Sequence, residues 1–220
     1  MSTRSAEYLE AIDHLPNGAV LLFSDVSWED YENVMEDLAD RPGLRIAYDE
    51  GTLEIMSPLP PHEEYKDTIL RLTQVLSEEL DIPIETRGST TWRRRKRSKG
   101  VEPDTCFYVA NAERIIGKRD INLESDPPPD IAVEIEITAE SLSKFPIYAA
   151  LKVPEIWRYD GTQVQMYKMT PDGEYLEIEA SQFFSVLTSA MLTGLLEASK
   201  TQGQTQALKL LRQEIRSRKK

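Results

Sequence analysis

The sequence contains a single cysteine, Cys106, among its 220 residues. One thiol excludes an internal disulfide and fits a reducing compartment. The chain also lacks any apolar run near the roughly 20 residues that span a bilayer. The segment from Met1 to Asp13 carries acids and has none of the apolar stretch of a secretory signal. These absences predict a cytoplasmic protein with no membrane segment.

Positive charge is scarce as well. The chain has 26 lysines and arginines against 38 aspartates and glutamates, a net charge of −12. Phosphate contacts need local positive charge, so this balance argues against a general nucleic-acid binder. The basic residues gather in two clusters, which are Arg93, Arg94, Arg95, Lys96, Arg97 and Lys99, and the terminal Arg212, Arg216, Arg218, Lys219 and Lys220. Such a stripe can hold a polyanion; a solvated loop or a charge-protected edge strand is the alternative.

Apolar periodicity predicts one α+β domain with a helical C-terminal extension. Ser27 is placed to cap a helix that ends near Ala39, with Asp30 as its capping-box acid. Segments 44–48 and 52–56 alternate around a Gly-containing turn and predict a hairpin. The other expected elements are a helix after the prolines at 58, 60 and 61, strands at 82–86, 90–95, 105–109 and 131–135, a helix at 143–151, a hairpin at 155–159 and 162–167, a strand at 175–178 and a helical tail from residue 185.

Two of the most strand-like segments carry acids. Asp104 heads the strand at 105–109, and Glu134 lies between apolar neighbours in the strand at 131–135. Glu136 follows Glu134 on the same face by the period of two. A buried carboxylate needs a cation, a metal or hydrogen-bond donors as partners. The alternative is a one-sided sheet whose Glu134 and Glu136 face water.

Lys144 favours the interpretation in which these acids are buried and have partners. It falls at the start of the short helix, beside Ser143, which is placed to cap it. A cation in a first helical turn opposes the helix dipole and costs roughly 0.3–1 kcal/mol, so facing carboxylates would explain it better. The strand that carries Glu134 leads directly into this helix. Two carboxylates and a lysine around one cavity suit a hard divalent metal and a phosphate.

The succession of these segments is specific. It comprises Met56-Ser57-Pro58 with His62-Glu63, then Glu102-Pro103-Asp104, then Pro128-Pro129-Asp130-Ile131-Ala132-Val133-Glu134-Ile135, then Lys144, and then Tyr148-Ala149-Ala150-Leu151-Lys152-Val153-Pro154-Glu155-Ile156-Trp157. Over residues 25–195 it resembles the Uma-type restriction endonucleases of the PD-(D/E)XK nuclease superfamily. The resemblance implies an α/β (α+β) fold with a central mixed sheet flanked by helices, an N-terminal hairpin and a C-terminal helical extension. It divides the chain into an N-terminal segment (1–24), the nuclease-like domain (25–195) and a basic helical tail (196–220).

The resemblance also implies residue roles. Asp104 and Glu134 correspond to the acids that hold Mg²⁺, with Mn²⁺ as a substitute. The superfamily's lysine usually stands two residues after the second acid, where this chain has Glu136, and the family places it at Lys144. Glu63 matches an early-helix acid that completes the metal shell, with Glu64 as the neighbouring option. Glu136 is an added metal ligand, a partner for Lys144 or a solvated strand residue.

The function implied is an endodeoxyribonuclease that cuts DNA phosphodiester bonds with a divalent metal. Lys144 would assist the attacking water, and the basic run at residues 93–99 would steer the DNA backbone. A homodimer is expected, because two sites cut both strands of a duplex more readily. One alternative is a nuclease fold that has lost catalysis and binds DNA or a protein partner. Another is a structural protein that self-associates through its C-terminal helix. His62 is interpreted as a helix cap or surface residue.

Overall fold

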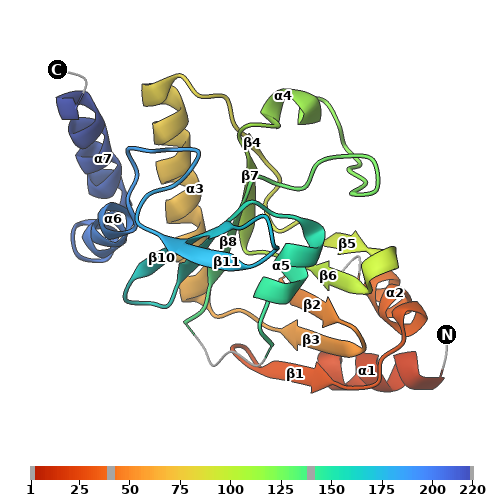
Figure 1. The fold of residues 1–220 in the computed structure, drawn as a ribbon. Coiled ribbons are helices and arrows are strands. Elements are labelled where there is room, and N and C mark those ends of the chain that lie inside the picture. The colour runs from red at the N-terminus through yellow and green to blue at the C-terminus, as the bar shows by residue number, and fades with distance from the viewer. Residues whose placement is uncertain (1–2, 39–42, 138–141, 219–220) are drawn as a thin grey trace.

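The computed structural model describes residues 3–38, 43–137 and 142–218. Its strands form two sheets, one of five strands and one of six. In Figure 1 the five-stranded sheet lies beside the N-terminal helices, and the helices that end the chain lie at the opposite side of the molecule. In the part of the chain that the structure describes, no helix is long and apolar enough to cross a membrane.

The five-stranded sheet is antiparallel and has the order β1-β3-β2-β6-β5. Its strands are β1 (Val20–Phe23), β2 (Arg45–Asp49), β3 (Thr52–Met56), β5 (Trp92–Arg94) and β6 (Lys99–Val101). The helices α1 (Thr3–Asp13) and α2 (Trp28–Asp37) pack against it through a core that includes Tyr31 and Leu53. The expected β2–β3 hairpin is confirmed, and Gly51 takes the left-handed turn position at φ 101°.

The six-stranded sheet has the order β11-β10-β9-β8-β7-β4 and is mixed, because β8 and β9 run parallel while its other pairs are antiparallel. Its strands are β4 (Glu85–Thr86), β7 (Thr105–Tyr108), β8 (Ile131–Ile135), β9 (Glu155–Tyr159), β10 (Val164–Met169) and β11 (Tyr175–Ile178). The parallel pair requires a crossover, and α5 (Phe145–Leu151) lies within that connection. The predicted central mixed sheet is confirmed.

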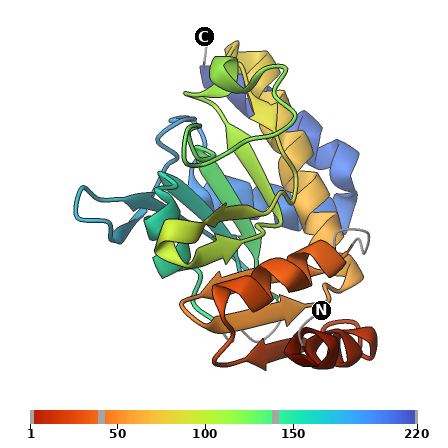
Figure 2. The same cartoon turned by 90° about the vertical axis from the view of Figure 1, so that its right-hand side faces the viewer.

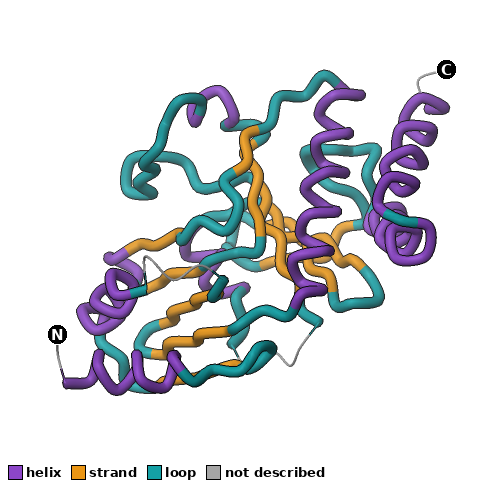
Figure 3. Tube along the Cα trace, turned by 180° about the vertical axis from the view of Figure 1, so that it is seen from behind, coloured by secondary structure: helices purple, strands orange, loops and turns teal. Residues whose placement is uncertain are grey.

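Helices cover both faces of the six-stranded sheet. Side chains alternate along each strand, so Val133 faces α3 (Pro60–Leu80), α6 (Ser189–Gln202) and α7 (Gln204–Arg218), whereas Ala132 faces α5. Figures 2 and 3 show α3, α6 and α7 grouped on one side of the strands. This arrangement leaves the α5 face next to the five-stranded sheet, and the candidate site forms there.

Several local predictions need correction. The strands expected at 82–86 and 90–95 are shorter, because only β4 and β5 pair, and Arg95–Arg97 forms a 3-10 turn. The short helix begins at Phe145 with Lys144 as its N-cap and no side-chain cap, so the predicted capping by Ser143 is wrong. The predicted cap at Ser27 is confirmed: its hydroxyl accepts a hydrogen bond from the Asp30 backbone N–H at 3.1 Å. Residue 39, the expected end of that helix, lies outside the described residues.

Candidate active site

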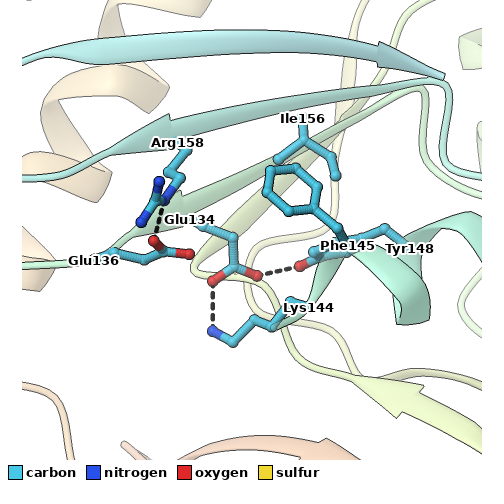
Figure 4. Close-up of a pocket in the computed structure, with 7 residues that line it drawn as sticks. All are labelled: Glu134, Glu136, Lys144, Phe145, Tyr148, Ile156 and Arg158. Carbon is cyan, nitrogen blue, oxygen red and sulfur yellow. Dashed lines mark hydrogen bonds and ion pairs between the residues drawn. The ribbon is translucent and has the colours of Figure 1, made fainter. Parts of the chain in front are cut away.

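Glu134 lies near the end of β8, and its side chain is only 3% exposed. Lys144 Nζ donates to Glu134 Oε2 at 2.6 Å, and the Tyr148 hydroxyl donates to Oε1. Lys144 and Tyr148 stand four residues apart at the start of α5, which places both on the side that faces β8. Figure 4 shows the two donors converging on the carboxylate. The crossover after β8 therefore supplies both partners of its own glutamate.

Asp104, which precedes β7, is 2% exposed, and the β7–β8 register brings it close enough for its charge to act on Glu134. Its backbone N–H donates to Val133 O at 3.1 Å, and its Oδ2 accepts from the Ile135 N–H at 2.7 Å. These two contacts bracket Glu134 on β8. The antiparallel pairing of β7 with β8 thus fixes the aspartate against the glutamate.

Arg45 joins this acid pair to the five-stranded sheet. Its Nε lies 3.1 Å from Asp104 Oδ1, and its NH2 nitrogen lies 2.8 Å from Glu63 Oε1. The Glu102 carboxylate is 3.8 Å from the NH1 nitrogen of the same guanidinium. Arg45 is buried on β2, so the site is assembled from both sheets.

The electrostatics of the site leave a surplus of negative charge. Burial, reinforced by the charge of Asp104 and opposed by Lys144, raises the pKa of Glu134 to about 7. Burial disfavours the charged form of Lys144, yet the charges of Glu134, Asp104 and buried Glu54 outweigh it and raise its pKa. Three buried carboxylates therefore act on two largely buried cations, Lys144 and Arg45.

This donor set fits a hard divalent cation. Each carboxylate oxygen of Asp104 and Glu134 accepts one hydrogen bond and keeps a second lone pair. Mg²⁺ is commonly held by one or two carboxylates and otherwise by water, and the surplus negative charge favours it. Among the described residues, no group of three or more His, Cys, Asp or Glu side chains is arranged to hold a metal. A metal here would rest on the Asp104–Glu134 pair.

The other predicted acids lie around this pair. Glu63, in the first turn of α3, pairs with Arg45 and Lys66, whose hydrogen bonds and charges outweigh partial burial and lower its pKa. Glu64 is exposed, so of the two options Glu63 is the one joined to the site. Glu136 is 12% exposed and pairs with Arg158 on β9. The interpretation of Glu136 as a solvated strand residue is therefore wrong.

A small pocket of about 10 Å³ lies at Glu134 and is also lined by Glu136, Lys144, Tyr148 and Arg158, as Figure 4 shows. The basic run lies elsewhere, on β5, the 3-10 turn and β6. Arg93, Arg95, Lys96 and Arg97 are exposed, and Arg94 is half-buried. Lys99 is 9% exposed, and its amine pairs with Asp49 and Glu50, so it is not free to contact DNA as expected.

The sequence interpretation missed Arg45, Tyr148 and Arg158. Two signals pointed to Tyr148: it begins one of the segments that carry the family resemblance, and it stands four residues after Lys144. His62 is a cap, as expected, because its Nδ1 accepts from the Leu59 N–H at 3.1 Å. It is also fully buried, so the surface interpretation is wrong, and its Nε2 has no hydrogen-bond partner among the described residues. Burial lowers the pKa of His62. The charge of Asp104 opposes this shift, whereas the charges of Arg45 and Lys144 add to it.

A mixed sheet with helices on both faces, and a buried acid pair with a lysine at the end of its parallel strands, define a restriction-endonuclease-like α/β protein. The profile of the family described as "Uma2: Putative restriction endonuclease" matches residues 28–199. The chain belongs to this family.

Among solved structures, the chain is similar to "a putative nuclease belonging to DUF820 from Anabaena variabilis ATCC 29413". The identity is 15% and the TM-score is 0.44, and the match covers 68% of this chain and 89% of that one. No curated protein matches the chain.

Proposed function

We propose that this protein is a divalent-metal-dependent endonuclease that hydrolyses phosphodiester bonds in DNA. The observation that carries the proposal is the buried Asp104–Glu134 pair with Lys144 Nζ 2.6 Å from Glu134. Membership of the family supports nuclease chemistry, and DNA is the substrate that the family description implies.

Asp104 and Glu134 would hold Mg²⁺ or Mn²⁺, with Glu63 and Glu136 nearby as further acids. Such an ion, when bound, lowers the pKa of water and polarises the phosphate. In hydrolysis the water oxygen bonds to phosphorus while the bond to the leaving oxygen breaks. Negative charge grows on the phosphate oxygens in that transition state.

Lys144 supplies the cation for this step. Its ammonium is a compact point charge, and the neighbouring carboxylates keep it protonated, so it suits orienting the water and offsetting the growing charge. Tyr148 and the Ile135 N–H hold the two carboxylates in fixed orientations. Arg45 is a positioning residue, because it acts through Asp104.

The exposed arginines of the basic run are proposed to contact the DNA backbone away from the cutting site. Arg95 lies 3.6 Å from Glu32, and Lys96 lies 3.5 Å from Glu124, both on the surface, where such pairs are weak enough to exchange for phosphates. A cytoplasmic homodimer is also proposed, and light scattering tests the oligomeric state.

The test is nicking and linearisation of supercoiled plasmid with Mg²⁺ or Mn²⁺. The wild type is compared with Glu134→Ala and Lys144→Ala, and Glu155→Gln serves as a matched control at a buried glutamate outside the site. We expect metal-dependent cutting by the wild type and the control and its loss in both site variants. Equal cutting by all four proteins would indicate a contaminant. DNA binding without any cutting would favour a nuclease fold that has lost catalysis.

A further inference from the structure

A second pocket adjoins the candidate active site. It has a volume of about 380 Å³ and lies between α5 and the hairpin formed by β10 and β11. This volume falls in the range of roughly 300–1,000 Å³ typical of ligand pockets. Its lining includes Ser143, Phe145, Pro146, Tyr167, Glu174 and Tyr175. We call it the aromatic pocket.

Strand register places the aromatic pocket beside Glu134. Glu134 pairs with Arg158 on β9, and on the same face Ile156 of β9 pairs with Tyr167 of β10. Neighbouring strands are about 4.8 Å apart, so Tyr167 lies roughly 10 Å across the sheet from the strand of Glu134. Phe145 lines both pockets and directly follows Lys144 in the chain. A substrate phosphate at Lys144 would therefore leave the adjoining nucleotide within reach of the aromatic pocket.

The lining of the pocket suits a flat, uncharged ring. The Phe145 ring centre lies 4.9 Å from that of Tyr167 and 5.4 Å from that of Tyr175, and all three rings are partly exposed. None of the described residues that line the pocket is a lysine or arginine, so it does not suit a phosphate. The carboxylate of Glu174 is exposed and able to accept a hydrogen bond from an amino group.

We propose that the aromatic pocket receives an unstacked nucleobase from the strand whose phosphate is cut, so that the preferred substrate has an unpaired nucleotide at that point. This inference rests on the proposed nuclease function and deepens it. A base inside a duplex must be flipped out to enter such a pocket, and flipping is least costly for an unpaired or mismatched base. Stacking on aromatic side chains contributes roughly 5- to 150-fold in affinity per base. Glu174 favours bases with an exocyclic amine, as acids do when they accept from cytosine.

The test measures binding without cutting. A single-stranded DNA hexamer with one internal 2-aminopurine is titrated with the full chain in Ca²⁺, and the fluorescence of the base reports its surroundings. Ala149 lines the pocket on α5, so Ala149→Leu fills the pocket while leaving the acid pair and Lys144 intact. Ala150→Leu makes the same change on the same helix at a residue that does not line the pocket. Thermal melting of each variant checks that it folds.

We expect a fluorescence change on binding, an affinity at least about 5-fold weaker for Ala149→Leu, and little change for Ala150→Leu. Glu174→Gln, at an exposed position, is expected to weaken binding of the 2-aminopurine strand less than Ala149→Leu does. No fluorescence change with the wild type, or equal affinity of the wild type and Ala149→Leu, would overturn the pocket. Plasmid cutting with no fluorescence change would contradict the base site and support the nuclease function. Base binding with no plasmid cutting would support the base site and contradict the nuclease function.

Discussion

The two ends of β8 both bury acids, and they hold them differently. At the start of the strand Asp130 accepts from the backbone N–H groups of Val109 and Asn111 at 2.7 and 3.0 Å, and from the Asn111 side-chain amide at 2.8 Å. Beside it Glu155, fully buried, accepts from the Trp157 indole at 2.6 Å and from the Gln182 N–H at 2.8 Å. Among the described residues, neither acid pairs with a cation. At the other end Asp104 and Glu134 face Arg45 and Lys144.

The comparison shows that burial of an acid does not by itself identify a site. Neutral donors satisfy Asp130 and Glu155, and these hydrogen bonds hold the segments that lead into β8 and β9. At the Glu134 end each acid has a cationic side chain as a partner in addition to a neutral donor, and a small pocket opens beside them. Long cationic side chains can exchange a carboxylate for a phosphate, whereas a backbone N–H cannot move away.

The largest effect is expected from removing the cation that serves Asp104. Arg45→Met would leave a buried carboxylate unpaired, which costs about 3–5 kcal/mol of unfolding free energy. Urea denaturation measures this loss. Arg216→Met, which removes an exposed arginine that pairs with Glu79, is the control and should change the midpoint far less. Equal midpoints for both variants would mean that Arg45 does not stabilise the site.

Next in size is the contrast between the two aspartates. Asp104→Asn is expected to reduce plasmid cutting by roughly 10²–10³-fold, because it removes charge from the reacting centre. Asp130→Asn should cut normally per folded molecule while losing about 1.5–3 kcal/mol of stability, because it weakens charged hydrogen bonds. Parallel cutting and denaturation measurements separate the two. A reversal of these outcomes would break the distinction between the ends of β8.

The pH dependence of metal binding sharpens the contrast further. The pKa of Glu134 is raised to about 7, so below that pH a proton competes with the metal for its carboxylate. Affinity for Mn²⁺ is therefore expected to rise with pH up to about 7 and then level off, by up to about 10-fold per pH unit below it. Titration calorimetry from pH 5.5 to 8.5 measures this. Glu155→Gln should give the same curve, and Glu134→Gln should not.

The smallest effect is expected at Glu155. Burial raises its pKa above the ordinary 4.5, so the folded protein binds that proton more tightly than the unfolded chain does. Its contribution to stability is present below pH 4.5 and is lost as the pH rises through the folded-state pKa. The stability of Glu155→Gln relative to the wild type should therefore increase with pH over this window. Urea midpoints at several pH values test it, and a constant difference would contradict it.

The alternating segments of the fold were predictable from sequence, because a hairpin such as β2–β3 has a local pattern of two alternating segments around a Gly-containing turn. Local patterns also account for the errors. The stretches at 82–86 and 90–95 are rich in strand-forming residues, but only the parts that find partners in β7 and β6 become strands. The short β1 was not predicted, since its place is fixed by pairing with β3 and its own pattern is brief.

For the site, sequence reasoning proposed Asp104, Glu134 and Lys144, and the structure brings these three side chains together. It did not find Arg45. The partners of that guanidinium lie 18 and 59 residues further along the chain, and no local spacing points to them. The cap formed by His62 was expected, but its burial was not, since that burial depends on segments far away in sequence.

The position of Arg45 on β2 also bears on how the chain acquires its chemistry during synthesis. The guanidinium emerges 59 residues before Asp104, and Glu134 and Lys144 follow later still. A growing or half-folded chain therefore holds the parts of the site apart, because both sheets must dock before the acids and cations meet. Local opening of either sheet would likewise separate the acids of the site from its cations. The backbone amide of Ile135, held by Asp104, should accordingly exchange its hydrogen only at the rate of this shared opening.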